Sequence, residues 1–573
     1  MSSNLVFAAF SPSDKVPGFY GGIQYGVSGQ TAAGLPLALL LVGLMTTGTL
    51  QPDSQVQQIF QSADADTYAG PGSELATMAY DAFKNAPNTP IYITSAKPAS
   101  GGVASTATIA LGGTWNVAGS LTVRIAGTAI PLTVGAADTP STVATNLALA
   151  INGTLSGRLP ISTTASGATV VITCRTPGVR GNQHIVFLDA SLQPSGMTAS
   201  IVGSTWAATT AYTTTQFVVP TVANGFYYKC TTGGTSGSSQ PTFPTTVGTT
   251  VTDGSVTWTC WGTIVAQNTT TGITLGGGVG LETYTNLINT LTNAKYARHA
   301  FAANDASSAS TWEGSIDSQA LITSGIRQHV VVAINTTLAG AESLGQTTLN
   351  DPRFQCLFLQ NSETHPARMA AGVAGARALK EVSDPNASYD GAVIPTIMPQ
   401  SQTTDIPLHS QLVALLNNSV TPLTTQGGQV QIVRSITTKS LTNSAPDYST
   451  LDTGMATTPD FVLDQLSIVW SSSYANPVTG NTRVEPDPLQ NSGETTPPPG
   501  VAYPRTWTAT VQGQLQAMEL GRFPGTCPPI LYNVENDPPS TTFDAVNKRL
   551  LTIVPCWPTP ALHQGLVALN QAS

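Results

Sequence analysis

The chain has 573 residues, of which 41% are hydrophobic and 9% charged, and its formal net charge at pH 7 is −9. The length predicts roughly three or four compact units. The low charge and the high hydrophobic content exclude a disordered chain, and the 53 Gly and 40 Pro residues favour a β-rich protein with many turns. The 22 Lys and Arg residues are scattered along the sequence, which disfavours a nucleic-acid-binding protein.

The N-terminal hundred residues are expected to form an α/β unit. Met1 to Phe10 has no basic segment before its apolar residues, so no signal peptide is expected. The apolar run from Leu35 to Met45 is shorter than the roughly 20 residues of a membrane-spanning helix and predicts a buried strand. Ser73 is expected to cap a helix with apolar residues at helical spacing, and Ile91 to Thr94 to form the next strand.

Between residues 103 and 200 the hydrophobic period changes to two. Apolar residues alternate over 121–125 and again over 130–134, with Gly127 between them, which predicts a hairpin. A helix with Pro140 in its first turn follows, and further strands are expected at 170–172 and 185–188. This segment is expected to form a small β-rich domain.

Residues 204–262 predict a second β unit that is dense in aromatic residues. Its candidate glycan-stacking residues are Trp206, Tyr212, Tyr227 and Trp258, which are similar in style to those of chitin-binding-like modules. The alternative is that these rings fill a core that is short of Leu and Ile. Cys230 and Cys260 are candidates for a local disulfide, because both flank strands of one small unit.

Beyond residue 275 the α/β pattern returns. Helices are expected at 281–291, 367–380 and 507–520, and strands at 329–334, 356–359 and, as the last core strand, 550–554. Residues 429–437 follow Gly427 and Gly428 and predict the second arm of a hairpin. Because α/β texture lies on both sides of the β-rich units, the flanks are expected to form one discontinuous domain.

The sequence offers no catalytic, cofactor or metal constellation. It lacks the GxGxxG, GxxxxGK[ST], HExxH and GxSxG patterns, its six cysteines include no CxxC pair, and its six histidines are spread singly. We therefore expect no enzyme activity, no cofactor and no metal site.

Four short motifs follow one another along the chain in a recognisable order. They lie at residues 16–20 (VPGFY), at 70–76 (GPGSELA), in the hairpin and helix at 126–128 and 144–151, and at 430–438 (VQIVRSITT) followed by 447–452 (DYSTLD). Together they resemble the tail sheath proteins of contractile phages, in particular the Mu-like branch. The resemblance covers the flanks and the 103–200 segment and leaves out residues 204–262.

The resemblance implies a structural subunit that polymerises helically around a tail tube and contracts to drive the tube through the host envelope. It implies stacked hexameric rings of this chain, a tail tube protein, and baseplate and tail terminator proteins as partners, with assembly in the host cytoplasm and a final place in the virion tail. Neither nucleic-acid binding nor direct membrane insertion is expected.

Two groups of residues receive roles from the resemblance. Terminal arms of sheath subunits add strands to neighbouring subunits, and the inter-subunit arm residues of this chain would be Val6, Phe7, Leu566 and Val567. Arg434 would belong to the core fold, which favours a structural ion pair over a side chain that points to solvent.

The expected fold class is α+β multidomain, with a discontinuous α/β core sheath domain, two inserted β-rich domains and extended terminal arms. The expected boundaries are 1–20 for the N-terminal arm, 21–100 and 267–558 for the two parts of the core domain, 101–203 for the β-rich domain, 204–266 for the small aromatic-rich module and 559–573 for the C-terminal arm. The alternative function is an extracellular carbohydrate-binding surface protein that uses the 204–266 module. The split α/β flanks and the missing signal peptide favour the sheath.

Overall fold

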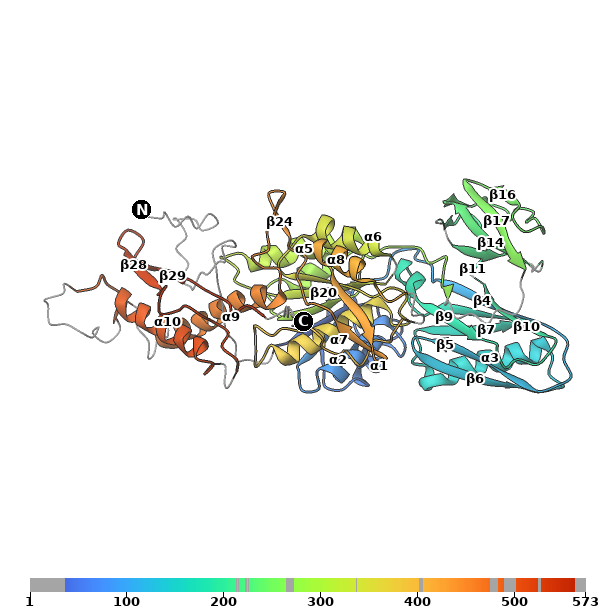
Figure 1. Cartoon of the computed structure of the whole chain (residues 1–573), viewed down its shortest axis with the longest axis horizontal. Helices are drawn as coiled ribbons and strands as arrows, with labels where there is room; N and C mark the ends of the chain where they lie inside the picture. Colours follow the sequence, from blue (N-terminus) through green and yellow to red (C-terminus); the bar gives the residue numbers. More distant parts are fainter. Residues whose placement is uncertain are drawn as a thin grey trace, which may run out of the picture.

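The computed structural model describes residues 37–202, 204–212, 214, 216–221, 224, 226–263, 273–335, 337–400, 405–474, 483–488, 501–523 and 527–561. The molecule is elongated (Figure 1). A central sheet with its helices lies between the C-terminal helices α9 (Thr453–Val469) and α10 (Pro504–Glu519) at one end and β-rich units at the other. None of the described helices combines the length and apolarity needed to cross a membrane.

The central sheet has eight strands and combines segments that are far apart in sequence. Its order is β2-β3-β1-β19-β20-β21-β22-β23, and all neighbours from β3 to β22 run parallel, whereas β2 and β23 are antiparallel to their neighbours. The bounds are β1 (Leu39–Gly43), β2 (Val56–Ile59), β3 (Ile91–Ser95), β19 (Arg298–Phe301), β20 (His329–Ile334), β21 (Phe354–Phe358), β22 (Thr421–Gln426) and β23 (Gln429–Ile432). Strand β1 therefore pairs on one side with a segment almost half the chain length away.

Helices cover both faces of this sheet. One face packs against α1 (Asp64–Ala69), α2 (Glu74–Asn85) and α7 (Pro366–Lys380). The other face packs against α4 (Thr285–Leu291), α5 (Ala306–Ala320), α6 (Leu338–Glu342), the π-helix η3 (Ser343–Leu349) and α8 (His409–Asn417). All five residues of β1 are buried between the layers, and full burial of each leucine stabilises the fold by about 1.5–3 kcal/mol.

Two local features explain the helix packing. The hydroxyl of Ser73 accepts a hydrogen bond from the backbone N–H of Ala76 at 3.0 Å, which confirms the predicted cap of α2. Helix α7 is rich in alanine and approaches α2 closely, since a Cβ at Gly375 would lie 3.1 Å from the carbonyl oxygen of Ala82.

The β-rich unit that follows β3 has one core between two four-stranded sheets. The first has the order β10 (Met197–Val202), β4 (Thr106–Gly113), β8 (Thr169–Cys174), β7 (Ile161–Ser166), and the second β18 (Ile273–Thr274), β9 (Ile185–Asp189), β5 (Gly119–Ile125), β6 (Thr128–Val134). Helix α3 (Pro140–Gly153), the short helix η1 (Thr154–Gly157) and the 3-10 helix η2 (Val179–Gln183) complete it. The predicted β5–β6 hairpin and the helix at Pro140 are both confirmed.

The chain enters and leaves this unit along a narrow two-stranded neck. Val103 bridges Val279 and Thr106 bridges Gly276 in antiparallel fashion. Gly280 has φ +111°, and a Cβ there would lie 3.1 Å from the Cα of Gly102, so this crossing requires glycine. The β-rich unit thus leaves the central sheet and returns to it at one place.

The small module forms a five-stranded sheet with a separate two-stranded pair. The sheet order is β11 (Ser204–Thr205), β13 (Phe217–Val219), β14 (Phe226–Thr232), β17 (Val256–Thr263), β16 (Thr250–Asp253), and the pair is β12 (Ala211–Tyr212) with β15 (Gly234–Thr235). It has its own small core of aromatic residues, Val218, Val256 and two cysteines.

The predicted disulfide in this module is absent, because all six cysteines of the chain are free thiols. Strand pairing places Cys230 opposite Trp258 and Cys260 opposite Tyr228, so the two cysteines are diagonal neighbours. Diagonal positions on a sheet are about 7–8 Å apart, whereas a disulfide brings its two Cβ atoms to about 4 Å. The strand register therefore opposes the bridge.

The C-terminal part has a hydrophobic core of its own, which the sequence analysis did not anticipate. Helices α9 and α10 enclose it with Phe461, Trp507 and Val511. Two two-stranded pairs accompany it, β26 (Arg483–Val484) with β27 (Val501–Ala502) and β28 (Ser540–Asp544) with β29 (Arg549–Ile553). A further pair, β24 (Leu441–Thr442) with β25 (Ala445–Pro446), lies beside the central part, where Asn350 bonds to Leu441. The π-helical turn η5 (Trp470–Tyr474) ends α9.

Three predicted elements differ in extent from the observed ones. The helix expected at 281–291 begins only at Thr285, because Gly280 and Glu282 belong to the returning neck. The hairpin arm expected at 429–437 ends as a strand at Ile432. Strand β29 is a half-buried surface strand and not a core strand, since its only partner among the described residues is β28.

Candidate functional site

Buried charged side chains gather at the two ends of the parallel strands of the central sheet. We call these sets the Arg180 junction, made of Glu74, Arg180, Glu282 and Tyr284, and the Asp460 junction, made of Arg327, His329, Arg353, Asp460 and Asp464. The part of the chain that the structure describes contains no group of three or more His, Cys, Asp and Glu side chains able to hold a metal ion. The charged side chains of the two junctions pair with one another instead.

The Arg180 junction joins the β-rich unit to the C-terminal end of β1. Arg180 lies in η2, Glu74 is the first residue of α2, and Glu282 follows the neck. The guanidinium donates from Nε and Nη2 to the two oxygens of Glu74, both at 2.9 Å, and from Nη1 to Oε2 of Glu282 at 2.5 Å. Oε2 of Glu74 also accepts from the backbone N–H of Leu44 at 2.9 Å. One arginine therefore links three separate segments.

The charges of this junction depend on one another. Burial opposes ionisation of Glu74, but the charge and hydrogen bonds of Arg180 outweigh it and lower the pKa of Glu74 below its ordinary value. Burial also opposes the charge of Arg180, yet the carboxylate of Glu74, with Tyr284 and Glu282, raises the pKa of Arg180 well above its ordinary value. Burial raises the pKa of Glu282 despite Arg180, and the charge of Glu74 adds to the rise. One guanidinium serves two carboxylates, so its removal would leave both without a counter-charge.

Further contacts surround the Arg180 junction. The carbonyl oxygen of Arg180 lies 3.1 Å from Nε2 of His365, the N-cap residue of α7. The His365 ring stacks on His184 with a centroid distance of 4.4 Å, and burial lowers the pKa of both rings. The amides of Gln183 and Asn304 donate to each other at 3.0 Å. The β-rich unit is therefore fixed to the central sheet by several neighbouring contacts.

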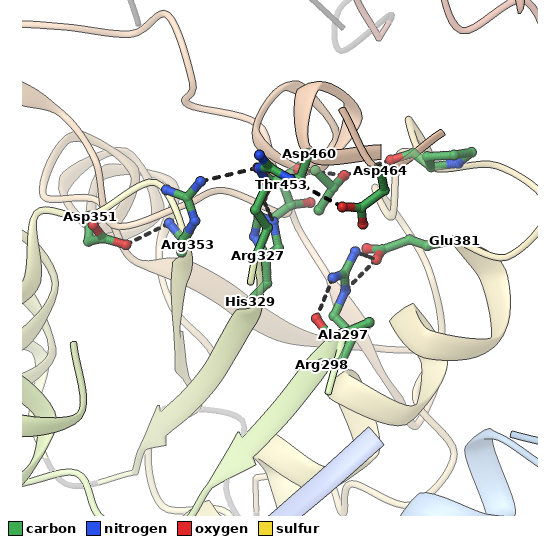
Figure 2. A network of polar contacts seen from close by, with 12 residues as sticks. Ala297, Arg298, Arg327, His329, Asp351, Arg353, Glu381, Thr453, Asp460 and Asp464 are labelled. Atoms are coloured by element: carbon green, nitrogen blue, oxygen red, sulfur yellow. Dashed lines mark hydrogen bonds and ion pairs between the residues drawn. The ribbon is translucent and has the colours of Figure 1, made fainter. Parts of the chain in front are cut away.

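The Asp460 junction lies at the opposite, N-terminal end of the strands, as Figure 2 shows. Asp460 and Asp464 lie on α9, while His329 begins β20 and Arg353 precedes β21. Oδ2 of Asp460 lies 2.9 Å from Nε2 of His329, and its Oδ1 accepts from Nη2 of Arg353 at 3.1 Å. Nη1 of Arg327 donates to Oδ1 of Asp464 at 3.2 Å. These contacts join the C-terminal part to the central sheet.

The protonation states at this junction follow from its partners. Burial alone would raise the pKa of Asp460, but Arg353, His329 and Arg327 lower it well below its ordinary value. Burial lowers the pKa of His329 to about 4, although its hydrogen bond to Asp460 acts in the opposite direction. At neutral pH a neutral His329 thus donates its Nε2–H to an ionised Asp460.

A second buried set lies beside this junction on α7 (Figure 2). Glu381 contacts the guanidinium of Arg298, the first residue of β19, and accepts from Nε of Arg377 at 2.8 Å. Nη1 of Arg377 in turn donates to Oε1 of Gln355 at 3.0 Å. Burial raises the pKa of Glu381, yet the two arginines outweigh it and lower that pKa. This set fixes the C-terminal end of α7 to the sheet.

Both junctions have a mechanical role, because their buried ion pairs oppose separation of the parts that they join. A buried ion pair adds little net stability when complete, but breaking it costs roughly 3–5 kcal/mol because a charge is left without a partner in the interior. Displacement of the β-rich unit or of α9 from the central sheet would break such pairs. The arrangement favours movement of the three parts as one body.

Arg434 forms the expected structural ion pair. Its Nε and Nη2 donate to the two carboxylate oxygens of Asp452 at 2.8 and 3.0 Å. Both residues belong to the 430–438 and 447–452 motif, and a backbone bridge between Ile436 and Asp452 runs beside the pair. The motif thus contains both partners of one local ion pair.

The predicted arm residues Val6, Phe7, Leu566 and Val567 lie outside the described residues.

The predicted glycan-stacking role is wrong for three of its four residues. Trp206, Tyr212 and Trp258 are exposed by only 6%, 2% and 0% and fill the core of the small module, as the alternative interpretation held. Tyr227 is half-buried and lies on the opposite face of the sheet, because strand neighbours alternate between faces and Tyr228 points into the core.

Asp253 organises this aromatic core and was not recognised in the sequence. Its Oδ2 accepts from the indole N–H groups of Trp206 at 2.6 Å and Trp258 at 2.9 Å, and its Oδ1 accepts from the backbone N–H of Gly237 at 2.8 Å. Buried donors without partners cost about 1–3 kcal/mol each. The carboxylate therefore holds three segments of the module together.

Asp253→Ala is expected to unfold the small module at a denaturant concentration well below that of the rest of the protein, because it leaves two indole N–H groups and one amide unpaired. Tryptophan fluorescence during urea unfolding would show a separate early transition. Asp253→Asn, which keeps one oxygen acceptor, should give an intermediate effect. A single unchanged transition in the alanine variant would contradict this role.

The junction residues were missed for a common reason. Arg180 lies in a Gly- and Gln-containing stretch that is typical of a loop, and Asp460 follows Pro459 inside a helix that the pattern did not suggest. The one signal in the sequence was the rarity of charged residues. Only 9% of residues are charged, and His329 directly begins an apolar strand. A charge at such a position needs a buried partner.

The comparisons with known proteins gave the following matches. No protein-family model matches the chain. Over 178 residues it is 28% identical to the Mu-like prophage FluMu tail sheath protein of Haemophilus influenzae, a match that covers 30% of this chain and 36% of that protein. The chain thus spans about a third of the length of this curated relative.

Two solved structures are also similar. A sheath tail protein of Desulfitobacterium hafniense matches 93% of this chain and 99% of its own at 11% identity with a TM-score of 0.42. A sheath tail protein of Listeria innocua matches 77% of this chain and 78% of its own at 12% identity with a TM-score of 0.35.

Proposed function

We propose that this chain, whose predicted resemblance to phage tail sheath proteins is confirmed by its match to a curated sheath protein, is itself a structural subunit of a phage tail sheath. The observation that carries the proposal is the 178-residue match, and the order of the motifs in the same sequence agrees with it. The role is structural, and no enzymatic activity is proposed.

In this role the chain polymerises helically around a tail tube as stacked hexameric rings and contracts to drive the tube through the host envelope. Its partners are further copies of itself, the tail tube protein, and the baseplate and tail terminator proteins. Assembly takes place in the host cytoplasm, and the final location is the virion tail. Neither nucleic acid nor membrane insertion has a part in this function.

The two junctions support this function because they make the subunit rigid. Contraction of a helical polymer is a rotation of subunits as rigid bodies, which requires each subunit to transmit force without coming apart. Buried ion pairs at both ends of the central sheet oppose separation of the outer parts from the centre. We assign them this force-transmitting role.

The β28–β29 pair supports exchange of strands between subunits. It has no third strand among the described residues, and a two-stranded sheet alone is marginally stable in water. Such open edges recruit a strand from another chain. We propose that the apolar arms around Val6 and Phe7 and around Leu566 and Val567 supply that strand from neighbouring subunits.

The proposed architecture follows the same logic. The eight-stranded sheet that joins residues 39–95 with residues 298–432 supports a discontinuous core sheath domain. The neck and the separate cores support the β-rich unit and the small module as two inserted domains, and β18 and Leu275 extend the β-rich unit beyond the expected boundary at residue 267.

Negative-stain electron microscopy of the purified protein tests the function directly. We expect tubes or stacked rings of uniform diameter. A protein that stays monomeric at high concentration, alone and with a tail tube protein, would contradict the proposal.

Deleting Met1 to Phe10 is expected to leave a folded protein that no longer forms tubes, because the subunit loses the strand that links it to its neighbours. Size-exclusion chromatography with light scattering would show a monomer with unchanged circular dichroism. Replacing residues 204–262 with a Gly/Ser linker is the matched control and should preserve tube formation. Tubes formed by the arm deletion would refute strand exchange by this arm.

A further inference from the structure

We propose that the outer face of the small module binds an anionic polysaccharide, through a surface formed by Phe217, Tyr227, Lys229 and Trp261, which we call the Trp261 face. It uses a different set of residues from the one predicted from the sequence, because three of those are buried. The proposal is independent of the sheath function, which concerns other parts of the molecule.

Strand pairing gathers these side chains on one side of the sheet. Phe217 on β13 lies directly opposite Lys229 on β14, and Lys229 lies opposite Thr259 on β17. Side chains alternate along a strand, so Tyr227 and Trp261 share this side, while Tyr228 and Cys260 point into the core. A register shift next to Tyr228 helps to direct Trp261 outward.

The rings form a continuous but open cluster. The centroid of Phe217 lies 5.8 Å from that of Tyr227 and 6.3 Å from that of Trp261. Trp261 is 45% exposed, an unusual position for so large an apolar ring, and Phe217 and Tyr227 are half-buried against each other. Such rings offer apolar faces on which a sugar ring can stack.

The charge of this face indicates the kind of partner. Residues 204–263 contain two charged side chains, Lys229 and Asp253, and Asp253 is buried. Nζ of Lys229 lies 4.1 Å from the centroid of Trp261, which holds the ammonium beside the rings. The charge on this face is therefore a half-buried cation with no acidic residue near it on the module, and its complement is an anionic group on the ligand.

The remainder of the face suits a sugar polymer better than a second copy of this chain. Hydroxyls of Thr231 and Thr259 lie 3.0 Å apart beside Lys229 and offer neutral hydrogen-bonding groups for sugar hydroxyls. A stable protein contact buries about 800 Å² on each side, whereas here three rings stand among threonines on short strands. In Figure 1 the sheet of β14, β16 and β17 lies at the end of the molecule remote from α10.

The test uses the full chain and isothermal titration with polygalacturonate, polysialic acid and neutral dextran. We expect measurable binding to at least one of the two acidic polymers and at least about tenfold weaker binding to dextran. Trp261→Ala should weaken binding to the acidic polymer at least about tenfold. Lys229→Gln should remove the preference over dextran.

Tyr448→Ala is the matched control, because Tyr448 is an exposed aromatic residue outside the module, and its binding should equal that of the unmodified chain. Thermal melting verifies that each variant is folded. Absence of binding to both acidic polymers, or equal binding by all variants, would overturn the proposal. Unchanged glycan binding with impaired self-association of Trp261→Ala would also overturn it and identify the face as a contact between copies.

Discussion

Replacing Arg180 with Met is expected to lower the free energy of unfolding by roughly 3–5 kcal/mol, because Glu74 and Glu282 remain buried without a counter-charge. Local unfolding should begin at the neck, since Arg180 links η2 to the end of β1 through Glu74. Urea unfolding measures the energy, and limited proteolysis at residues 96–105 and 276–284 reports opening of the neck.

Two further variants make this result specific. Arg158→Ala removes a half-exposed ion pair with Asp66 between the same two units and should cost at most about 1 kcal/mol. The triple variant Glu74→Gln, Arg180→Met, Glu282→Gln should recover part of the loss, because no unpaired charge remains. Equal effects of Arg180→Met and Arg158→Ala would show that burial of the junction has no energetic consequence.

Replacing His329 with Gln is expected to reduce the acid sensitivity of the protein. In the folded state burial lowers the pKa of His329 to about 4, while in the unfolded chain the ordinary value near 6.5 returns. The unfolded state therefore binds a proton between pH 6.5 and pH 4 that the folded state does not, and stability falls as the pH is lowered through this window. Between pH 7 and pH 4.5 this group contributes a loss of about 2 kcal/mol.

The measurement is the difference between variant and unmodified protein in urea unfolding at pH 7 and pH 4.5. This comparison is needed because burial raises the pKa of Asp351 to about 8 and of Glu313 to about 7, and such carboxyl groups act on stability in the opposite direction. Their contribution cancels in the difference. His409→Gln, at an exposed position, should leave the pH dependence unchanged. An equal loss of stability between pH 7 and pH 4.5 in the His329→Gln variant and in the unmodified protein would refute the assignment.

The sequence predicted local structure where local chemistry determines it. Ser73 caps α2 and Pro140 begins α3 because both act within a single turn, and the alternation on either side of Gly127 directly sets a hairpin. The resemblance likewise favoured a structural ion pair for Arg434, and the structure identifies Asp452 of the same motif as its partner.

Long-range pairing escaped prediction because it depends on residues far apart in the chain. Nothing near Arg180 indicates that Glu74 and Glu282 will meet there, and Asp460 finds its partners more than a hundred residues earlier. The aromatic residues of the small module show the same limit. Their type and spacing were clear, but which rings face inward depends on the strand register, which buries Trp258 and exposes Trp261.

The position of β1 has a consequence for synthesis on the ribosome. This strand of five buried residues needs β19 as a neighbour, and that segment is translated about 250 residues later, which at about 5–20 residues per second takes on the order of tens of seconds. During this delay the nascent chain carries an apolar strand with one unsatisfied edge, while the β-rich unit and the small module can close their own cores. Slow translation and chaperone cover of the first hundred residues should therefore decide the yield of folded protein.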